Sequence, residues 1–240
     1  VKGIPNLTPS LFAWEYNSDN VSMMPAIINT LVMTLLSLLI SVPLGVFAAI
    51  YLTEYARRGN KLVKVVRITA ETLAGIPSIV YGLFGYLMFV VTLKLDFSIL
   101  AGALTLSIMV LPTIMRTTEE SIKSVPDSFR EGSFGLGAGR LRTVFVIILP
   151  SAMQGILAGV ILSIGRIVGE TAALLFTSGT ATGLPDSLLD SGRTLSVHMY
   201  MLSTEGLHIN ETYATAVVLL VLVVGINALS GFLAKKLAKG

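Results

Sequence analysis

The chain has 240 residues, of which 53% are hydrophobic and 13% are charged, and it contains no cysteine. Because a soluble domain carries roughly 25% charged residues, this composition, with a mean hydropathy of +0.81, indicates an integral membrane protein. The lack of cysteine excludes disulfides, thiolate metal sites and cysteine nucleophiles. The formal charge of +3 is compatible with nucleic-acid binding, but the positions of the charges indicate membrane topology instead, so no nucleic-acid partner is expected.

The predicted elements are membrane-spanning helices, since five uncharged runs reach the roughly 17–25 residues that a spanning helix needs. They are residues 25–52, 73–93, 97–115, 143–165 and 212–234. The fourth is expected to start near Pro150 and to continue through Arg166 and Glu170 to about Phe176. The predicted fold class is therefore all-α, a polytopic membrane helical bundle of five spans. An external segment, 1–24, precedes a single transmembrane domain, 25–240.

Basic residues are concentrated on one side of these spans. Residues 53–72 contain five Lys or Arg, residues 116–142 contain five, and the C-terminal tail contains three. The other side has only Lys2, Lys94 and Arg193, so the basic loops and the C-terminus are expected in the cytoplasm. Residues 177–212 then form an outer loop. Since five spans place Val1 outside and no initiator Met is present, a sixth, N-terminal span is expected to be missing.

The cytoplasmic loop 116–142 contains the signals of a short surface helix. Pro126 and Asp127 suit a first helical turn, and Gly137 suits the position just after a helix end. The spacing predicts a helix of about three turns from Pro126 to Leu136, which also carries Arg130 and Glu131. A soluble partner could grip such a helix, although an ordinary loop helix without a partner would show the same signals.

Two charged residues occur inside the fourth predicted span. Arg166 and Glu170 are four residues apart, so a continuous helix would place them on one face. Because a charge at the centre of the bilayer costs about 2.5–3.5 kcal/mol, neither side chain is expected to face lipid. The pair could be an ion pair that fixes helix register, or an anion site in which the Arg166 guanidinium binds an oxyanion. In the second case the hydroxyls of Ser163 and Thr171 could complete the site.

The cytoplasmic loop resembles the signature loop of bacterial and archaeal ABC importer permeases. That signature has two alanines after a glutamate, a glycine six residues beyond the glutamate, and then, after nine intervening residues, the motif I-x-L-P. The matching positions in this chain are Glu131, Gly137, Ile147, Leu149 and Pro150. Gly132 and Ser133 stand where the family has its two alanines. The resemblance implies that a partner ATPase contacts Pro126, Arg130, Glu131, Leu136 and Gly137.

Further segments resemble the A-type permease subunit of the phosphate-specific ABC importer family. They are GIPSIVYGLFG (75–85), IGRIVGETAALLFT (164–177), LSVHMYMLSTEG (195–206) and EYARRGN (54–60). The resemblance implies a multi-pass subunit of the prokaryotic cytoplasmic membrane, surrounded by lipid, which imports inorganic phosphate. It also implies three partners: a second, homologous permease, two copies of an ATP-binding subunit, and an extracytoplasmic phosphate-binding protein.

Other functions remain open at this stage. The same machine could import sulfate, molybdate or tungstate, because one Arg–Glu pair does not distinguish tetrahedral anions. A secondary transporter that works without ATP is a further alternative. The sequence has no G-x-x-x-x-G-K-S/T motif, so ATP and Mg²⁺ are expected on a partner and no enzymatic activity in this chain. The two histidines, His198 and His208, predict no metal site, and no cofactor or catalytic residue is expected.

Overall fold

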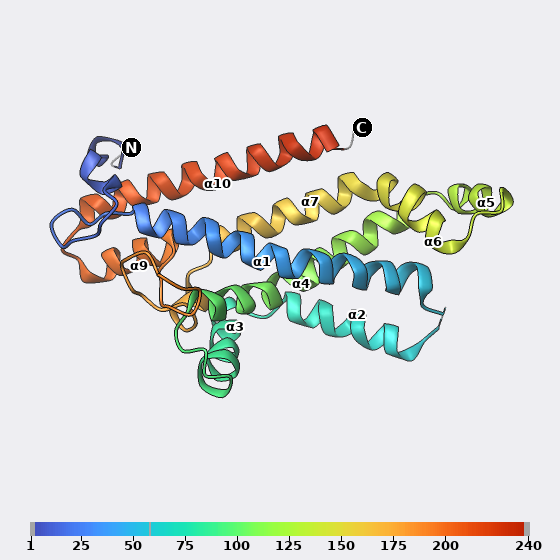
Figure 1. Ribbon diagram of the computed structural model, residues 1–240, viewed down its shortest axis with the longest axis horizontal. Coiled ribbons are helices and arrows are strands. Elements are labelled where there is room, and N and C mark those ends of the chain that lie inside the picture. The colour runs from blue at the N-terminus through green and yellow to red at the C-terminus, as the bar shows by residue number, and fades with distance from the viewer. Residues whose placement is uncertain (1–2, 58, 238–240) are drawn as a thin grey trace. The chain divides into compact units, whose positions relative to one another are not determined.

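The computed structural model describes residues 3–57 and 59–237, and every regular element in those ranges is a helix (Figure 1). This confirms the predicted all-α class. Three of the basic residues used to predict topology, Lys2, Arg58 and Lys239, lie outside the described residues.

The helices follow one another in the order α1 to α10. Their bounds are α1 Met24–Ile50, α2 Lys61–Ala74, α3 Ser78–Gly85, α4 Ile99–Lys123, α5 Asp127–Gly135, α6 Arg140–Thr143, α7 Leu149–Val168, α8 Ala172–Leu175, α9 Leu195–Glu205 and α10 Ile209–Leu237. Three π-helical segments, Tyr51–Tyr55, Tyr86–Thr92 and Val144–Ile148, extend α1 and α3 and lead into α7. Two 3₁₀ turns, Ile4–Asn6 and Pro9–Phe12, precede α1.

Four continuous helical segments are long and apolar enough to cross a membrane. They are Met24–Tyr55, Ile99–Lys123, Arg140–Val168 and Ile209–Phe232, which correspond to the first, third, fourth and fifth predicted spans. The second predicted span, 73–93, is wrong as a single straight helix. The chain there bends by 107° between Lys61–Ala74 and Ser78–Thr92, and up to five spans result if this bent pair counts as one.

The bend has a local cause in the sequence G-I-P at 75–77. Proline has no N–H to donate and disfavours helical backbone in the residue before it, so α2 ends at Ala74 and a new helix starts after Pro77. Hydrophobic continuity alone does not reveal this break.

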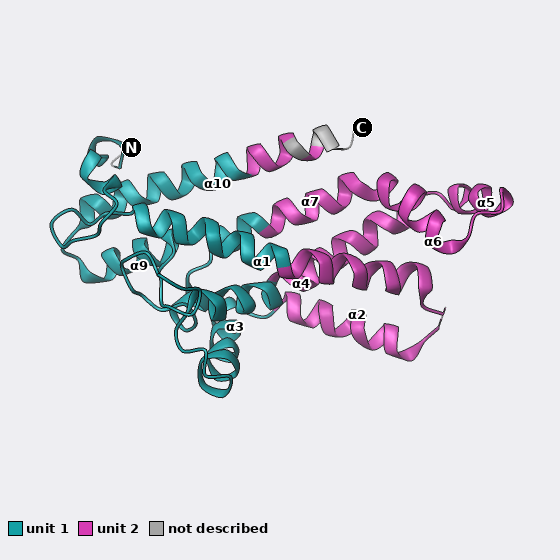
Figure 2. Cartoon of the chain, in the orientation of Figure 1, with its two compact units in different colours: residues 1–39, 76–109, 164–226 teal, residues 40–75, 110–163, 227–240 magenta. Residues whose placement is uncertain are grey.

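The chain separates into two compact units, which Figure 2 colours differently. Unit 1 comprises residues 1–39, 76–109 and 164–226, and unit 2 comprises 40–75, 110–163 and 227–240. The sequence-based division into an external segment, 1–24, and a transmembrane domain, 25–240, does not coincide with these units, because unit 1 contains residues on both sides of residue 24. That division concerns membrane topology and stays a prediction.

Unit 2 has an apolar core at the end that carries α5. Ile122 and Val125 from α4 and the following turn pack with Val144 and Ile148, which lead into α7. Farther along, α4 and α7 approach closely because glycine occupies α7 at the contact points. A Cβ at Gly155 would lie within van der Waals overlap of the Ser121 side chain, so small residues permit this packing, as is common in membrane helices.

Unit 1 has a core in which the N-terminal segment takes part. Leu11 and Met23 pack with Leu195 of α9 and Ala214 of α10. The α9 helix lies within the predicted outer loop, where no helix was expected. The loop is therefore partly a packed structure rather than only a solvated connection.

Candidate functional site

The α5 helix begins and ends where its sequence predicts. It runs from Asp127 to Gly135, with Pro126 immediately before it, which confirms the predicted surface helix to within one residue at each end. Gly137 has φ +81°, a backbone conformation that favours glycine. The amides of Gly137 and Ala138 donate to the carbonyls of Phe134 (2.9 Å) and Ser133 (3.1 Å). This bonding pattern is the Schellman motif, so the predicted role of Gly137 is confirmed.

Arg130 fastens α5 to the rest of unit 2. Its Nη2 and Nε donate to the Glu54 carboxylate, with 2.7 Å between Nη2 and Oε1. Its Nη1 donates to the carbonyl of Val125 (2.9 Å), and Nη2 also donates to that of Ile122 (3.1 Å). The Arg130 side chain is only 17% exposed and that of Glu54 only 11%. The guanidinium is therefore engaged within the unit, and Arg130 can affect a partner by positioning α5.

The two departures from the family signature have separate explanations. Ser133 is buried, and its hydroxyl is 2.8 Å from that of Thr143, so it joins α5 to α6. Gly132 is exposed, and a Cβ built there would meet no heavy atom within 4 Å. An alanine would fit at 132, whereas an alanine at 133 would leave the Thr143 hydroxyl with one fewer partner.

The outer face of α5 presents apolar side chains beside a carboxylate. Leu136 is 91% exposed, and Phe129 and Phe134 are also exposed. Glu131 lies on the same short helix and is exposed. Exposed large apolar residues beside charged ones, on a helix held rigidly at both ends, form a surface suited to docking in a groove of another protein.

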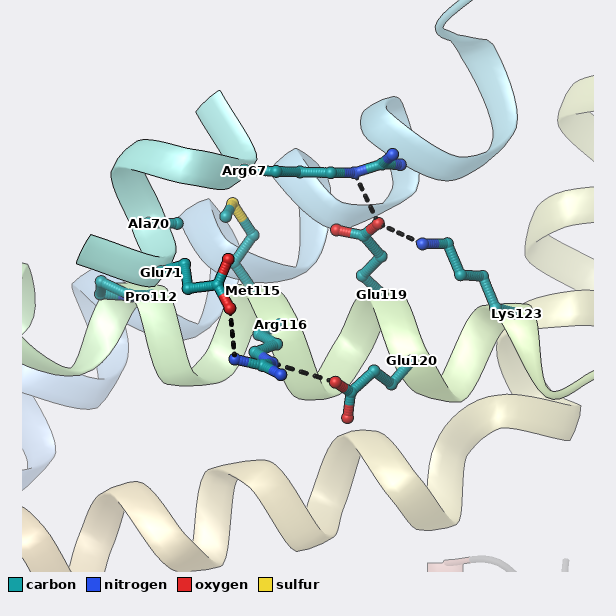
Figure 3. Close-up of a pocket in the computed structure, with 9 residues that line it drawn as sticks. All are labelled: Arg67, Ala70, Glu71, Pro112, Met115, Arg116, Glu119, Glu120 and Lys123. Atoms are coloured by element: carbon teal, nitrogen blue, oxygen red, sulfur yellow. Dashed lines mark hydrogen bonds and ion pairs between the residues drawn. The ribbon is translucent and has the colours of Figure 1, made fainter. Parts of the chain in front are cut away.

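A cavity of about 200 Å³ in unit 2 is lined by three basic and three acidic side chains (Figure 3). Arg67 of α2 and Lys123 of α4 both reach one oxygen of Glu119, at 2.8 and 2.5 Å. A second ion pair in the same cavity joins Arg116 to Glu120, with 3.0 Å between Nε and Oε1. These contacts tie α2 to α4.

Sequence reasoning used Arg67, Arg116 and Lys123 only to assign topology and missed this cluster. The available signal was the four-residue spacing of Arg116 with Glu120 and of Glu119 with Lys123, which places each pair on one face of a helix.

Arg166 and Glu170 are not arranged as the sequence predicted. The α7 helix ends at Val168 rather than near Phe176, so Glu170 does not lie one helical turn beyond Arg166. No ion pair joins Arg166 to Glu170 within the described parts of the chain. The chain turns at Gly169, and a short new helix, α8, follows at Ala172. The sequence from 165 to 176 stays largely apolar, so the hydrophobic pattern did not predict the end of the helix at Val168.

Each of the two charges is stabilised by a helix end. Arg166 lies in the last turn of α7, where the partial negative charge of the helix terminus favours a cation. Glu170 is buried, and its Oε1 accepts the amide of Ala173 (3.1 Å) in the first turn of α8. The Glu170 carbonyl accepts the Ser196 hydroxyl at 2.5 Å. Glu170 thus positions α8 and α9 rather than neutralising Arg166.

The remaining predicted site residues differ in what they can offer a ligand. Thr171 directly precedes α8, and its carbonyl accepts the amide of Leu175 at 3.1 Å. The Ser163 hydroxyl donates to the carbonyl of Gly159 (2.9 Å) in its own helix, so its proton is not free for an anion. Tyr81 of α3, which the sequence did not single out, is buried within electrostatic range of Arg166.

Comparisons with known proteins show to which family the chain is similar. A profile of the family described as "Binding-protein-dependent transport system inner membrane component" matches residues 41–240. The probable ABC transporter permease protein YqgI of Bacillus subtilis is 38% identical over 192 residues, 75% of this chain and 65% of that protein. The phosphate transport system permease protein PstA of Pasteurella multocida is 42% identical over 179 residues, 74% of this chain and 63% of that protein. This chain thus spans about two thirds of the length of these curated relatives.

Solved structures share the fold. The inward-facing MetNI methionine ABC transporter superposes with a TM-score of 0.69 and 21% identity, over 89% of this chain and 93% of that one. A bacterial alginate ABC transporter in complex with a pentasaccharide-bound periplasmic protein gives 0.72 and 15% identity, over 99% and 89% of the two chains. Both confirm the predicted importer-permease fold.

Proposed function

We propose, since this chain belongs to the family of inner membrane components of binding-protein-dependent transport systems, that it is the permease subunit of an ATP-driven importer of inorganic phosphate. The chain is a multi-pass membrane protein. The choice of phosphate is supported by relatives named phosphate transport permeases, at 34% and 42% identity in Mycobacterium leprae and Pasteurella multocida.

The observation that carries the proposal is the construction of α5. The helix is fixed at its end by the Schellman motif of Gly137 and at its base by Arg130, and it exposes Leu136 almost completely. A rigid helix that exposes an apolar face transmits force when a partner grips it. We assign that partner as an ATP-binding subunit, present in two copies, which binds and hydrolyses ATP with Mg²⁺. This chain then performs no catalysis and holds no cofactor.

The substrate contact is assigned to Arg166, with Thr171 as a second candidate contact. A guanidinium stays charged at any working pH and presents a planar fork that matches two oxygens of a tetrahedral anion. Because Glu170 caps α8, it leaves the charge of Arg166 available. Ser163 is left out of the proposed site because its proton is engaged by Gly159.

The assembly proposed around this chain has a second, homologous permease and an extracytoplasmic phosphate-binding protein. We assign α2, α5 and the C-terminus to the cytoplasmic side, because the basic residues of these segments favour that side by the positive-inside rule. The segment 177–212 then faces outside, toward the binding protein.

Cross-linking tests the docking of α5, because the chain has no cysteine of its own. We expect Leu136→Cys, labelled with a thiol-reactive photocross-linker, to link to the ATP-binding subunit in the assembled complex. Leu207→Cys is the matched control, since Leu207 is a similarly exposed leucine (81%) at the opposite predicted face. Equal linkage of the ATP-binding subunit to both positions, or to neither, would contradict the docking proposal.

A further inference from the structure

Arg193 is a buried arginine whose charge has no counterpart among the described residues. The residue is 3% exposed, and neither Nε nor Nη2 has a hydrogen-bond partner. Its backbone is held firmly, because its amide donates to Ala181 (3.1 Å) and its carbonyl accepts from the Asn29 side chain (3.2 Å). Two nitrogens of the guanidinium, Nε and Nη2, are thus left without hydrogen-bond partners, which is strongly unfavourable for a buried charge.

These two nitrogens form one edge of the guanidinium. This is the same edge with which Arg130 binds the Glu54 carboxylate. Nε–H and Nη2–H point in parallel and match two oxygens of one oxyanion. Arg193 thus presents a complete bidentate oxyanion-binding group without a protein oxyanion to fill it.

His198 has the same deficiency in the same part of unit 1. Its ring is fully buried, and among the residues that the structure describes neither Nδ1 nor Nε2 has a partner in hydrogen-bonding geometry. Burial, and secondarily the charge of Arg193, lower the pKa of His198 to about 3, while the nearby Val21 backbone opposes this shift without satisfying either nitrogen. The imidazole is therefore neutral at physiological pH and offers one donor and one acceptor.

Tyr16 covers both groups. The Arg193 guanidinium carbon lies 4.8 Å from the centre of the Tyr16 ring, and the His198 ring packs edge-on against it with 6.3 Å between centroids. Tyr16 is only half-buried, so the ring that shields the guanidinium itself reaches the surface.

The segment that carries Tyr16 is strained close to His198. Val21 has φ +45°, which is rare for a β-branched residue because its side chain crowds the backbone there. Strain and unpaired polar groups at one place both point to a role beyond packing, since each is unfavourable for folding alone.

We propose that Arg193 and His198 form an anion-binding site, closed by Tyr16, that takes a protonated tetrahedral oxyanion such as inorganic phosphate. The Nε–Nη2 edge of Arg193 binds two anion oxygens. The unprotonated nitrogen of the neutral imidazole accepts a hydrogen bond from the P–OH group. Arsenate carries such a proton at neutral pH and fits equally, whereas sulfate does not and leaves the imidazole acceptor unpaired.

This site is separate in sequence from Arg166. Its location within the segment 177–212 places it on the side that we assign as external, where the anion arrives. The choice of phosphate rests on the proposed function, but binding at this site requires neither ATP nor transport. A failure of one proposal is therefore distinguishable from a failure of the other.

Equilibrium binding of radiolabelled phosphate to the purified, ATP-free complex without binding protein tests the proposal. The Arg166→Gln background removes the proposed transport contact. We expect Arg193→Gln to weaken the remaining phosphate binding at least about tenfold, the cost of a lost charged hydrogen bond. Unchanged binding in Arg193→Gln would overturn the site.

Variants at two further positions, Tyr16 and His198, guard against a trivial loss through misfolding. Tyr16→Ala removes the cover and is expected to tighten phosphate binding several-fold, whereas Tyr16→Phe keeps the ring and leaves it unchanged. His198→Phe should abolish the preference for phosphate and arsenate over sulfate. A purely structural role for these residues predicts no tighter phosphate binding in Tyr16→Ala. The absence of that gain would contradict the proposal. Equal binding of sulfate and phosphate by the unmodified site would also contradict it.

Discussion

Arg130 and Arg166 illustrate two ways in which a membrane protein uses an arginine. The Arg130 guanidinium is surrounded by acceptors from its own unit, namely the Glu54 carboxylate and the carbonyls of Ile122 and Val125. Arg166 forms no ion pair with the described residues, because Glu170 is engaged by the amide of Ala173. An arginine that the protein satisfies acts by positioning its helix, and one that it leaves unpaired is available to a ligand.

The largest effect is expected at Arg130. Arg130→Met leaves the largely buried Glu54 carboxylate without its partner, and breaking such a pair costs about 3–5 kcal/mol. We expect a marked loss of thermal stability together with loss of ATPase binding, measured by unfolding of the purified subunit and by co-purification. The double variant Arg130→Met with Glu54→Leu removes both charges and should recover most of the stability. No recovery in the double variant would contradict the positioning role.

Arg166 should show the opposite pattern, with transport lost and stability kept. Arg166→Gln is expected to lower phosphate uptake per assembled complex roughly ten- to hundredfold, since a charged hydrogen bond contributes about 1.5–3 kcal/mol. Arg166→Lys should also be poor, because an ammonium cannot reproduce the bidentate fork. If Arg166→Gln instead lowers membrane abundance while uptake per complex is normal, Arg166 acts only as a stabilising cation at the end of α7.

Gly137 tests whether the end of α5 must have its left-handed backbone. Gly137→Val forces a β-branched residue to φ +81°, which costs about 1–2 kcal/mol in that region. The substitution should loosen the last turn of α5 and reduce coupling, measured as ATP-dependent uptake, while membrane insertion remains normal. Gly139→Val, two residues away at an ordinary extended backbone, is the matched control and should have little effect.

The smallest effect, and one of opposite sign, is expected at Gly132. Gly132→Ala meets no atom within 4 Å and replaces a poor helix former, so it should stabilise α5 by up to about 1 kcal/mol. Thermal unfolding would measure the gain, and ATPase binding should be retained. A loss of binding would show that the partner approaches the backbone at 132 more closely than an alanine allows.

Local sequence signals predicted α5 well because the termini of a helix depend on few residues. Pro126 and Gly137 determine where α5 begins and ends, and both could be recognised without knowing the fold. Proline and glycine also mark helix ends in other segments of this chain, and there they predict the structure better than an unbroken apolar run does. Pro77 breaks the second predicted span, 73–93, near its start, and the chain turns at Gly169 where the fourth was expected to continue.

Tertiary relations were the part that the sequence did not reveal. Arg130 and Glu54 are 76 residues apart, and nothing in either segment marks them as partners. Arg193 was counted as one basic residue of an outer loop, yet it is among the most buried charges in the described chain because α9 and the N-terminal segment pack around it. A helix within that loop escaped notice because its composition is mixed, with serine, threonine and histidine among its apolar residues.

The central claim, that this chain is the membrane subunit through which ATP hydrolysis drives phosphate entry, is tested most directly by reconstituted transport. Proteoliposomes would contain this permease, its second permease, the ATP-binding subunits and the phosphate-binding protein, with ATP supplied on the α5 side. The account predicts that radiolabelled phosphate accumulates only with ATP and that excess sulfate or molybdate does not reduce the rate. Accumulation without ATP, or equal competition by sulfate, would contradict it.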